Sequence, residues 1–283
     1  MMRALAYAKV NLALAVYPPS VDGYHPLSGI FQSVSLHDVV TIRGATQDTV
    51  TVSNNEGPAD SSNLAFVAMD AARRAARITA PASVDVVKHI PSGSGLGGGS
   101  ADAAAALGLM VRRYGIDPDT AVEIAASIGS DVPFSSTGGS CLVEGRGERL
   151  TPIESLEGFA LVIVVPPFSL STPDVFGRWD EMGGPSGTPL SDGVLPPVLR
   201  GGLPMRNDLY PAAASLDPRI DDWRAELAVL WGTEVAMTGS GSALFAFFVG
   251  LDEALDAADV VDTPTRAVEA VTPVRHGWEP LDE

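Results

Sequence analysis

The residues with the clearest chemical potential are the glycines and serines between Pro91 and Ser100. Five glycines fall between Gly93 and Gly99, and an alanine-rich segment that favours helix follows them. Glycine allows positive φ angles and close backbone approach, so such a run can direct its N–H groups at an anion. With Ser100 as the expected N-cap, a helix that begins near Ala101 adds free N–H donors and the positive end of its dipole. The stretch therefore predicts a phosphate site.

The elements on either side distinguish a phosphate loop from a flexible linker. Residues 82–88 alternate like a strand and residues 103–114 are strongly helix-forming, so the glycines join two ordered elements. A linker is the commoner meaning of a Gly/Ser run, but it rarely occupies such a place. The segment lacks the lysine of a Walker A motif and is not set in a dinucleotide-binding βαβ unit. We therefore expect a phosphate loop of another class.

Three segments together resemble the GHMP kinases, the superfamily of galactokinase, homoserine, mevalonate and phosphomevalonate kinases. They are Pro91-Ser-Gly-Ser-Gly-Leu-Gly-Gly-Gly-Ser-Ala-Asp-Ala, Ala8-Lys-Val-Asn-Leu12 and Ala236-Met-Thr-Gly-Ser-Gly241. The resemblance spans almost the whole chain. It implies an α+β, two-domain GHMP kinase fold with the active site in the interdomain cleft, with an ATP-binding domain over residues 1–150 and a C-terminal domain over residues 151–283.

A further string narrows the resemblance. Asp22-Gly-Tyr-His25, followed by Phe31-Gln-Ser-Val34, is similar to a segment of those GHMP members whose acceptor is a methylerythritol carrying a cytidine diphosphate. Homoserine and mevalonate kinases are not expected to carry it. The resemblance implies ATP-dependent phosphorylation of the acceptor's 2-hydroxyl, on the non-mevalonate route to isoprenoid precursors. Another GHMP kinase and a nucleotide-binding module without catalysis are the alternatives.

The resemblance assigns catalysis to Lys9 and Asp131. Lys9 and Asn11 project from one face of the strand expected at residues 3–16, because side chains alternate with period two. Asp131 corresponds to the family's catalytic aspartate, although an aspartate between a helix end and a proline is usually a cap or turn former. Such a pair would supply a cation near the transferred phosphoryl group and an acceptor for the hydroxyl proton. A binder without catalysis could lose either residue, and this chain has both.

The nucleotide site is expected around the glycine loop. The assigned loop residues are Pro91, Ser92, Gly93, Ser94, Gly95, Leu96, Gly97, Gly98, Gly99 and Ser100. By resemblance, Asn63 helps to hold the adenine and Lys88 lies near the base or ribose. Their alternatives are an N-terminal capping residue and a surface lysine at a strand end. Mg²⁺ is expected with ATP, because it bridges phosphate oxygens and offsets their charge; its protein ligands stay open.

The acceptor site has its own set of residues. They are Asn11, Tyr24, His25, Phe31, Thr172 and Phe176. By resemblance, Tyr24 and Phe176 stack on the two faces of the cytosine while His25 reads its edge; stacking gives affinity, and polar groups give selectivity. The turn at residues 239–242 is expected to fold against the glycine loop and close the phosphate pocket.

Hydrophobic periodicity and turn residues predict the other elements. Strands are expected at residues 137–143, 159–165, 234–237 and 243–249, with two short ones within 39–52. Helices are expected at residues 63–77, 117–129 and 219–230. The Gly- and Pro-rich segment 182–204 is expected to be the loosest part of the chain.

Composition limits the class of protein. A chain of 283 residues, 46% of them hydrophobic, has material for one or two packed domains. Its formal net charge of −17 argues against a nucleic-acid partner, which needs a basic surface. The single Cys141 excludes an internal disulfide and favours a reducing compartment, and no apolar run reaches membrane-spanning length. We expect a cytoplasmic enzyme, monomeric or homodimeric, whose partners are ATP and a small-molecule substrate.

Overall fold

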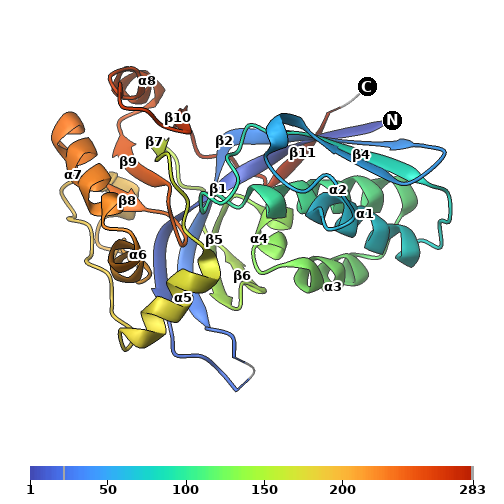
Figure 1. Ribbon diagram of the computed structural model, residues 1–283, viewed down its shortest axis with the longest axis horizontal. Coiled ribbons are helices and arrows are strands. Elements are labelled where there is room, and N and C mark those ends of the chain that lie inside the picture. Colours follow the sequence, from blue (N-terminus) through green and yellow to red (C-terminus); the bar gives the residue numbers. More distant parts are fainter. Residues whose placement is uncertain (22, 282–283) are drawn as a thin grey trace.

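Two sheets carry the fold of the computed structural model, which describes residues 1–21 and 23–281; Asp22 of the sequence motif lies outside them. Within the described residues, the seven-stranded sheet contains β1 (Met2–Val16), β2 (Leu27–Gly44), β3 (Thr49–Val52), β4 (Ala82–Val87), β5 (Ser140–Gly145), β6 (Arg149–Pro152) and β11 (Trp278–Leu281). The four-stranded sheet contains β7 (Ala160–Val165), β8 (Ala236–Met237), β9 (Leu244–Phe248) and β10 (Ala267–Val271). The α+β class is confirmed, with one sheet in each half of the molecule (Figure 1).

The long antiparallel pair β1–β2 is the spine of the larger sheet. Its register runs from Met2 opposite Ile42 to Val16 opposite Leu27, with irregularities on either side of the Lys9–Asn11 segment. Such bulges bend a strand and re-aim its side chains. The strand predicted at residues 3–16 is confirmed. The two short strands predicted within 39–52 are instead the end of the 18-residue β2 and the separate β3, because polar residues along the first half of β2 hide its apolar alternation.

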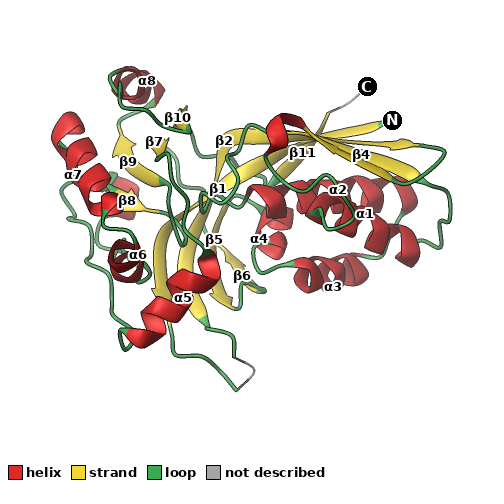
Figure 2. Ribbon diagram, in the orientation of Figure 1, coloured by secondary structure: helices red, strands yellow, loops and turns green. Residues whose placement is uncertain are grey.

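Four helices cover one face of the larger sheet (Figure 2): α1 (Leu64–Ala75), α2 (Gly98–Tyr114), α3 (Pro118–Ile128) and α4 (Val132–Thr137). Residues 101–106 of α2 are all buried, and their small side chains let the helix lie close to its neighbours. The sequence had predicted Ser100 as the N-cap of α2, and this prediction is wrong. Gly97 holds that position with φ 73°, and this left-handed turn starts the helix three residues before Ala101.

Helix α4 corrects another expectation, the strand at residues 137–143. The chain forms a helical turn up to Thr137, and β5 starts only at Ser140. Pro133 favours this short helix because its fixed φ suits a first turn. Gly138, with φ 71°, then ends the helix.

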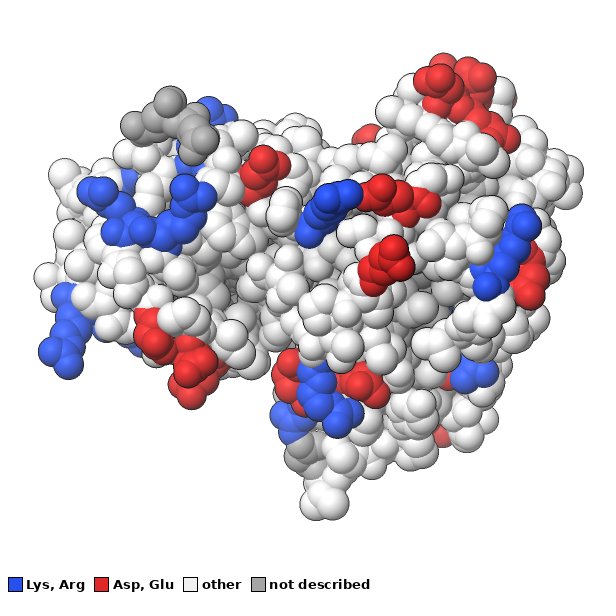
Figure 3. Space-filling view, turned by 180° about the vertical axis from the view of Figure 1, so that it is seen from behind, with Lys and Arg blue, Asp and Glu red and all other residues white. Residues whose placement is uncertain are grey.

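The second sheet is accompanied by α5 (Thr172–Glu181), α6 (Tyr210–Leu216), α7 (Arg219–Trp231) and α8 (Leu251–Asp259), shown in Figure 2. Acidic side chains gather over α8 at the upper right of Figure 3, where Asp252, Glu253, Asp256 and Asp259 are exposed. The segment 182–204 is better packed than expected, because its apolar side chains Leu195 and Leu199 are buried in the main core. A 3-10 turn, η2 (Pro197–Leu199), lies within it.

The two halves are joined at several places. Single bridges connect Leu14 to Asn207 and Val34 to Pro273. Strand β11 leaves the second half and pairs with β1 in the first sheet, from Arg3 opposite Leu281 to Ala6 opposite Trp278. The domain boundary near residue 150 stays a prediction, although this return shows that residues 278–281 belong to the first sheet. Among the described residues, every helix is too short or too polar to cross a bilayer.

Candidate active site

A cavity of about 740 Å³ contains most of the predicted site. Its volume is in the range of small-molecule sites. The predicted residues that line it are Lys9, Asn11, Tyr24, His25, Phe31, Pro91, Ser92, Gly93, Ser94, Gly95, Leu96, Gly97, Gly98, Gly99, Ser100, Asp131, Thr172 and Phe176. The structure thus brings together residues from β1, β2, the glycine loop, the start of α4 and α5. Asn63 and Lys88 are the predicted residues outside this lining.

Lys9 and Asp131 meet inside the cavity. The Lys9 Nζ lies 3.4 Å from Asp131 Oδ2 and donates a hydrogen bond of 2.5 Å to Asn11 Oδ1. It also lies 5.3 Å from the centre of the Phe31 ring. Lys9 is 5% exposed, so its charge acts in a poorly solvated place, where electrostatic interactions are strong. Asp131 occupies the N-cap position of α4 without making a side-chain capping bond, which leaves its carboxylate available to the cavity.

The glycine loop lies close to β1 and to the Thr238 backbone, and two of its positions leave no room for a Cβ. Leu96 O accepts a hydrogen bond of 3.0 Å from the Lys9 N–H. Gly97 has φ +73°, and a Cβ there would lie 2.9 Å from Lys9 Cγ. Gly95 has φ +86°, and its Cβ would lie 2.5 Å from Thr238 O. These positive φ angles turn the backbone as an anion-binding loop requires.

The second small-residue turn closes on the first, as predicted. The Ala243 N–H donates to Ser94 O at 2.9 Å, and a Cβ on Gly239 would lie 3.0 Å from Gly95 O. Gly239 and Ser240 line the cavity. The Ser240 and Thr172 hydroxyls are 2.7 Å apart, so this turn also reaches the start of α5.

Aromatic and charged side chains form the other end of the cavity. The His25 and Phe176 ring centres are 5.0 Å apart, and His25 Nε2 lies 2.8 Å from Asp180 Oδ1. The Arg146 guanidinium lies 4.2 Å from the centre of the Tyr24 ring. A planar base can stack on such rings, while a fixed imidazole can hydrogen-bond to its edge.

Asn63 and Lys88 have structural partners. The Asn63 side chain caps α1 by accepting a hydrogen bond of 3.0 Å from the Ala65 N–H, and its amide donates to Pro58 O at 2.9 Å. Lys88 is not a surface lysine, since it is 5% exposed. Its ammonium is paired with two buried carboxylates behind the glycine loop, Asp38 and Asp102.

Two charged residues near the aromatic side chains of the cavity were not identified from the sequence. Arg146 lines the cavity from the turn between β5 and β6, and the Gly145–Gly147 pair around it was the available signal. Asp180 fixes His25 from the last turn of α5. No motif marks Asp180, because its pairing depends on how α5 packs against the loop that carries His25.

The cavity does not contain an all-protein cage for a metal ion. Throughout residues 1–21 and 23–281, no three His, Cys, Asp or Glu side chains are placed to hold one. Mg²⁺ in kinases is commonly held by one or two carboxylates together with substrate phosphates and water. Asp131 is the carboxylate among the described residues that line the cavity, and it faces Lys9 at 3.4 Å, so most ligands of a magnesium ion here would come from phosphate and water.

Comparison with known proteins identifies the family. Residues 63–139 match the family described as GHMP kinases N terminal domain. The chain is 39% identical over 280 residues to the 4-diphosphocytidyl-2-C-methyl-D-erythritol kinase of Corynebacterium efficiens, covering 92% of this chain and 88% of that protein. The chain belongs to the 4-diphosphocytidyl-2-C-methyl-D-erythritol kinase family. A member from Carboxydothermus hydrogenoformans is 35% identical, covering 89% of this chain and 90% of its own.

Solved structures agree with this family. A crystal structure of 4-(cytidine 5'-diphospho)-2C-methyl-D-erythritol kinase matches with a TM-score of 0.80 and 33% identity, over 96% of this chain and 99% of the other. A homoserine kinase from Cytophaga hutchinsonii matches with a TM-score of 0.72 over 99% of this chain and 97% of its own, but at 17% identity. The second match shows a shared fold alone. The family membership confirms the narrower resemblance over the homoserine and mevalonate alternatives.

Proposed function

We propose that this chain transfers the γ-phosphoryl group of ATP to the 2-hydroxyl of 4-diphosphocytidyl-2-C-methyl-D-erythritol, giving the 2-phosphate and ADP on the non-mevalonate route to isoprenoid precursors. One observation carries the proposal. Lys9 and Asp131 lie 3.4 Å apart in a cavity whose wall also contains the glycine loop and the His25–Phe176 pair. The glycine loop, a cation, a carboxylate and an aromatic pair thus line one cavity. Family membership over most of the chain supports the choice of acceptor.

The proposed step needs little covalent work from the protein. The acceptor hydroxyl gives its proton to the Asp131 carboxylate while its oxygen forms a bond to the γ-phosphorus. The bond from that phosphorus to the bridging oxygen breaks, and ADP leaves with the electron pair. The Lys9 ammonium offsets negative charge on the transferred group. Asn11, which accepts from Lys9, keeps the ammonium in place.

The nucleotide is proposed to bind along the glycine loop. The backbone N–H groups of residues 93–100 and the N-terminus of α2 would hold its phosphates. Mg²⁺ is proposed to accompany ATP, where it would neutralise phosphate charge with ligands drawn mainly from phosphate oxygens and water. Asn63 and Lys88 would affect the nucleotide through the elements they hold, since neither lines the cavity.

The acceptor is proposed to place its cytosine at the aromatic end of the cavity. Tyr24 and Phe176 would contact the faces of the base, and His25, oriented by Asp180, would bind its edge. Thr172 and Phe31, which also line the cavity, would contact the rest of the acceptor.

A substrate panel tests the proposal. The purified chain is incubated with Mg²⁺ and ATP and with one of three acceptors: 4-diphosphocytidyl-2-C-methyl-D-erythritol, mevalonate or homoserine. We expect ADP release and a new phosphomonoester with the first acceptor only. Phosphorylation of mevalonate or homoserine instead would contradict the proposed acceptor. ADP release without any phosphorylated acceptor would contradict kinase function itself.

A further inference from the structure

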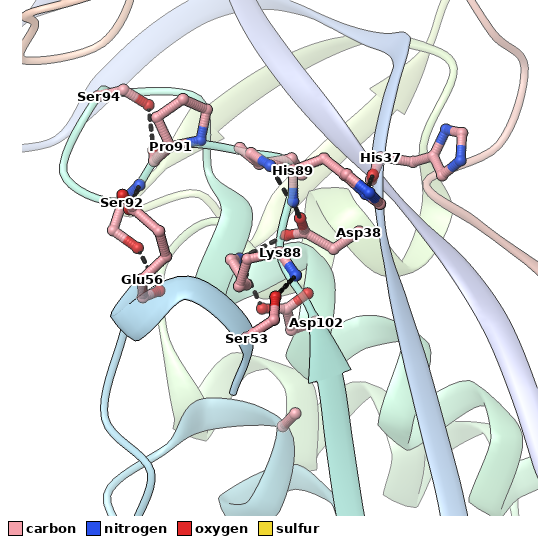
Figure 4. A network of polar contacts seen from close by, with 12 residues as sticks. His37, Asp38, Ser53, Glu56, Lys88, His89, Pro91, Ser92, Ser94 and Asp102 are labelled. Carbon is pink, nitrogen blue, oxygen red and sulfur yellow. Dashed lines mark hydrogen bonds and ion pairs between the residues drawn. The ribbon is translucent and has the colours of Figure 1, made fainter. Parts of the chain in front are cut away.

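Lys88 belongs to a buried charge cluster behind the glycine loop (Figure 4). Its ammonium donates hydrogen bonds to Asp38 Oδ2 and, at 2.8 Å, to Asp102 Oδ2. Asp38 and Asp102 are 0% and 4% exposed. We call Lys88, Asp38 and Asp102 the buried triad. None of the three lines the nucleotide cavity, so a direct contact of Lys88 with ATP finds no support in its position.

The buried triad connects the two ends of the glycine loop. On the entry side, Asp38 Oδ1 accepts hydrogen bonds from the N–H groups of His89, at 2.6 Å, and Ile90, at 2.8 Å. These residues lead directly into the loop. On the exit side, Asp102 belongs to α2, the helix with which the loop ends. Lys88, bonded to both carboxylates, therefore ties the entry to the exit.

The ammonium also lies directly against the start of α2. A Cβ on Gly98, the first residue of that helix, would be 3.1 Å from Lys88 Nζ. The loop entry has a second attachment, because the Ser92 N–H donates to Glu56 Oε2 at 2.8 Å and Ser92 O accepts from Arg266 at 2.7 Å. At the exit of the loop, Asp102 connects α2 to the Lys88 ammonium. Loss of Asp102, more than of the other two residues of the buried triad, should therefore free the N-terminus of α2.

The charges of the buried triad do not balance. Two carboxylates face one ammonium, and Asp102 Oδ1 is buried without a hydrogen-bond partner. Burial raises the pKa of Asp102 to about 7, against the opposing effect of Lys88. The surrounding titratable groups are on the Asp38 side: the His37 and His89 rings are 6.3 Å apart there, and burial raises the pKa of Glu269, which lies near His89. A buried ion cluster contributes little net stability, which favours a role in shaping the loop.

We propose that Lys88, Asp38 and Asp102 are positioning residues that hold the glycine loop and the N-terminus of α2 in the arrangement that binds nucleotide phosphates. This inference rests on the proposed use of ATP. The buried triad sets ATP affinity without touching ATP, and it leaves the acceptor end of the cavity unchanged.

Asp102→Ala is the variant that tests this role most cleanly. It removes the tie to α2 but leaves Lys88 and Asp38 as a neutral pair, whereas Lys88→Met would leave two buried carboxylates facing each other and is expected to fold poorly. Asp102→Asn keeps an oxygen that can accept from Lys88, so it should restore most of the effect. The matched control is Asp70→Ala on α1, which removes a carboxylate paired with Arg73 and Arg74 in the same helical layer.

Three measurements are made on the full chain, of which initial-rate kinetics gives KM for the acceptor. Calorimetry gives the Kd of a non-hydrolysable ATP analogue with Mg²⁺, and amide hydrogen exchange without nucleotide reports on residues 93–102. For Asp102→Ala we expect about a 10-fold weaker Kd, the equivalent of losing one hydrogen bond to a charged group, together with faster exchange in those residues. KM for the acceptor should stay unchanged. Asp70→Ala should match the wild type in all three quantities.

The outcomes separate the two proposals. If Asp102→Ala lowers the Tm but leaves the nucleotide Kd unchanged, the buried triad only stabilises the fold and the inference is overturned. An equal weakening in Asp70→Ala would also overturn it, because the effect would then not be specific to the triad. If the wild type binds the analogue but phosphorylates none of the acceptors, the proposed function fails, while the Kd comparison still tests the triad.

Discussion

Asp131 and Lys9 are the residues on which turnover should depend most directly. Asp131→Asn removes the proposed proton acceptor while keeping the shape of the side chain, so kcat should fall by about 10²–10⁴-fold, the usual range for general-base work. The Kd for ATP should change little. Lys9→Ala should lower kcat in the same direction, because it removes the cation 3.4 Å from Asp131. Steady-state kinetics and calorimetry measure both quantities.

The control for these variants is Asp117→Asn, which changes an exposed aspartate that caps α3. It should cost some stability and leave kcat intact. Wild-type turnover in Asp131→Asn would remove this aspartate from the mechanism.

Phe176 and His25 should determine how tightly the base of the acceptor binds and which base is preferred. Phe176→Ala loses stacking worth roughly 1–3 kcal/mol, which corresponds to about 10–100-fold in acceptor affinity. His25→Ala should reduce the discrimination between cytosine and uracil versions of the acceptor, because the edge of the base and not its face distinguishes them. Calorimetry with a non-hydrolysable ATP analogue present measures both effects, and nucleotide affinity serves as the internal control. Unchanged acceptor affinity in both variants would place the base elsewhere.

At the scale of the element, the glycine loop should tolerate a Cβ at some positions and not at others. Gly97→Ala places a methyl group 2.9 Å from Lys9 Cγ at φ +73°. It should therefore displace the Lys9 ammonium and lower kcat/KM for ATP by at least about 10-fold, as a ~1.4 kcal/mol loss would. Gly115→Ala, at the other end of α2, has φ +64° but no atom within 4 Å of its Cβ.

Gly115→Ala is therefore a control for backbone strain alone. It should cost about 1 kcal/mol of stability with unchanged kinetics. Thermal unfolding and initial-rate assays compare the two variants. Similar kinetic losses in both would attribute the Gly97 effect to general destabilisation of α2.

Helix α2 should also carry part of the pH dependence of stability. Burial raises the pKa of Asp102 from 3.8 to about 7, so between these pH values the folded chain retains a proton that the unfolded chain releases. The contribution is fully present below about pH 4 and is lost as the pH rises through about 7. In Asp102→Asn this fall should be absent. Urea unfolding of the wild type and of Asp102→Asn across this pH range gives the free energy of unfolding of each protein. The difference between the two should change with pH, and a constant difference would contradict the prediction.

For the molecule as a whole, local patterns predicted the elements that are set by local chemistry. The glycine loop, the shared face of Lys9 and Asn11, and the Asp117 cap of α3 all follow from spacing and residue type. The first half of β2 was missed because its polar residues are satisfied by distant partners, such as Ser140, which donates to Gln32 Oε1. The Lys88 pairing joins residues 14 and 50 positions apart, and no local pattern shows such a contact.

The return of β11 to β1 has a consequence for the order in which the chain is made. A ribosome releases β11 after every other described strand, so while the second half is being synthesised, one edge of β1 has no strand beside it. Trp278, which would lie 2.2 Å from a Cβ on Gly108 of α2, also arrives late. An unpaired strand edge attracts other chains. A nascent or truncated chain without residues 278–281 should therefore be the form of this protein most in need of a chaperone.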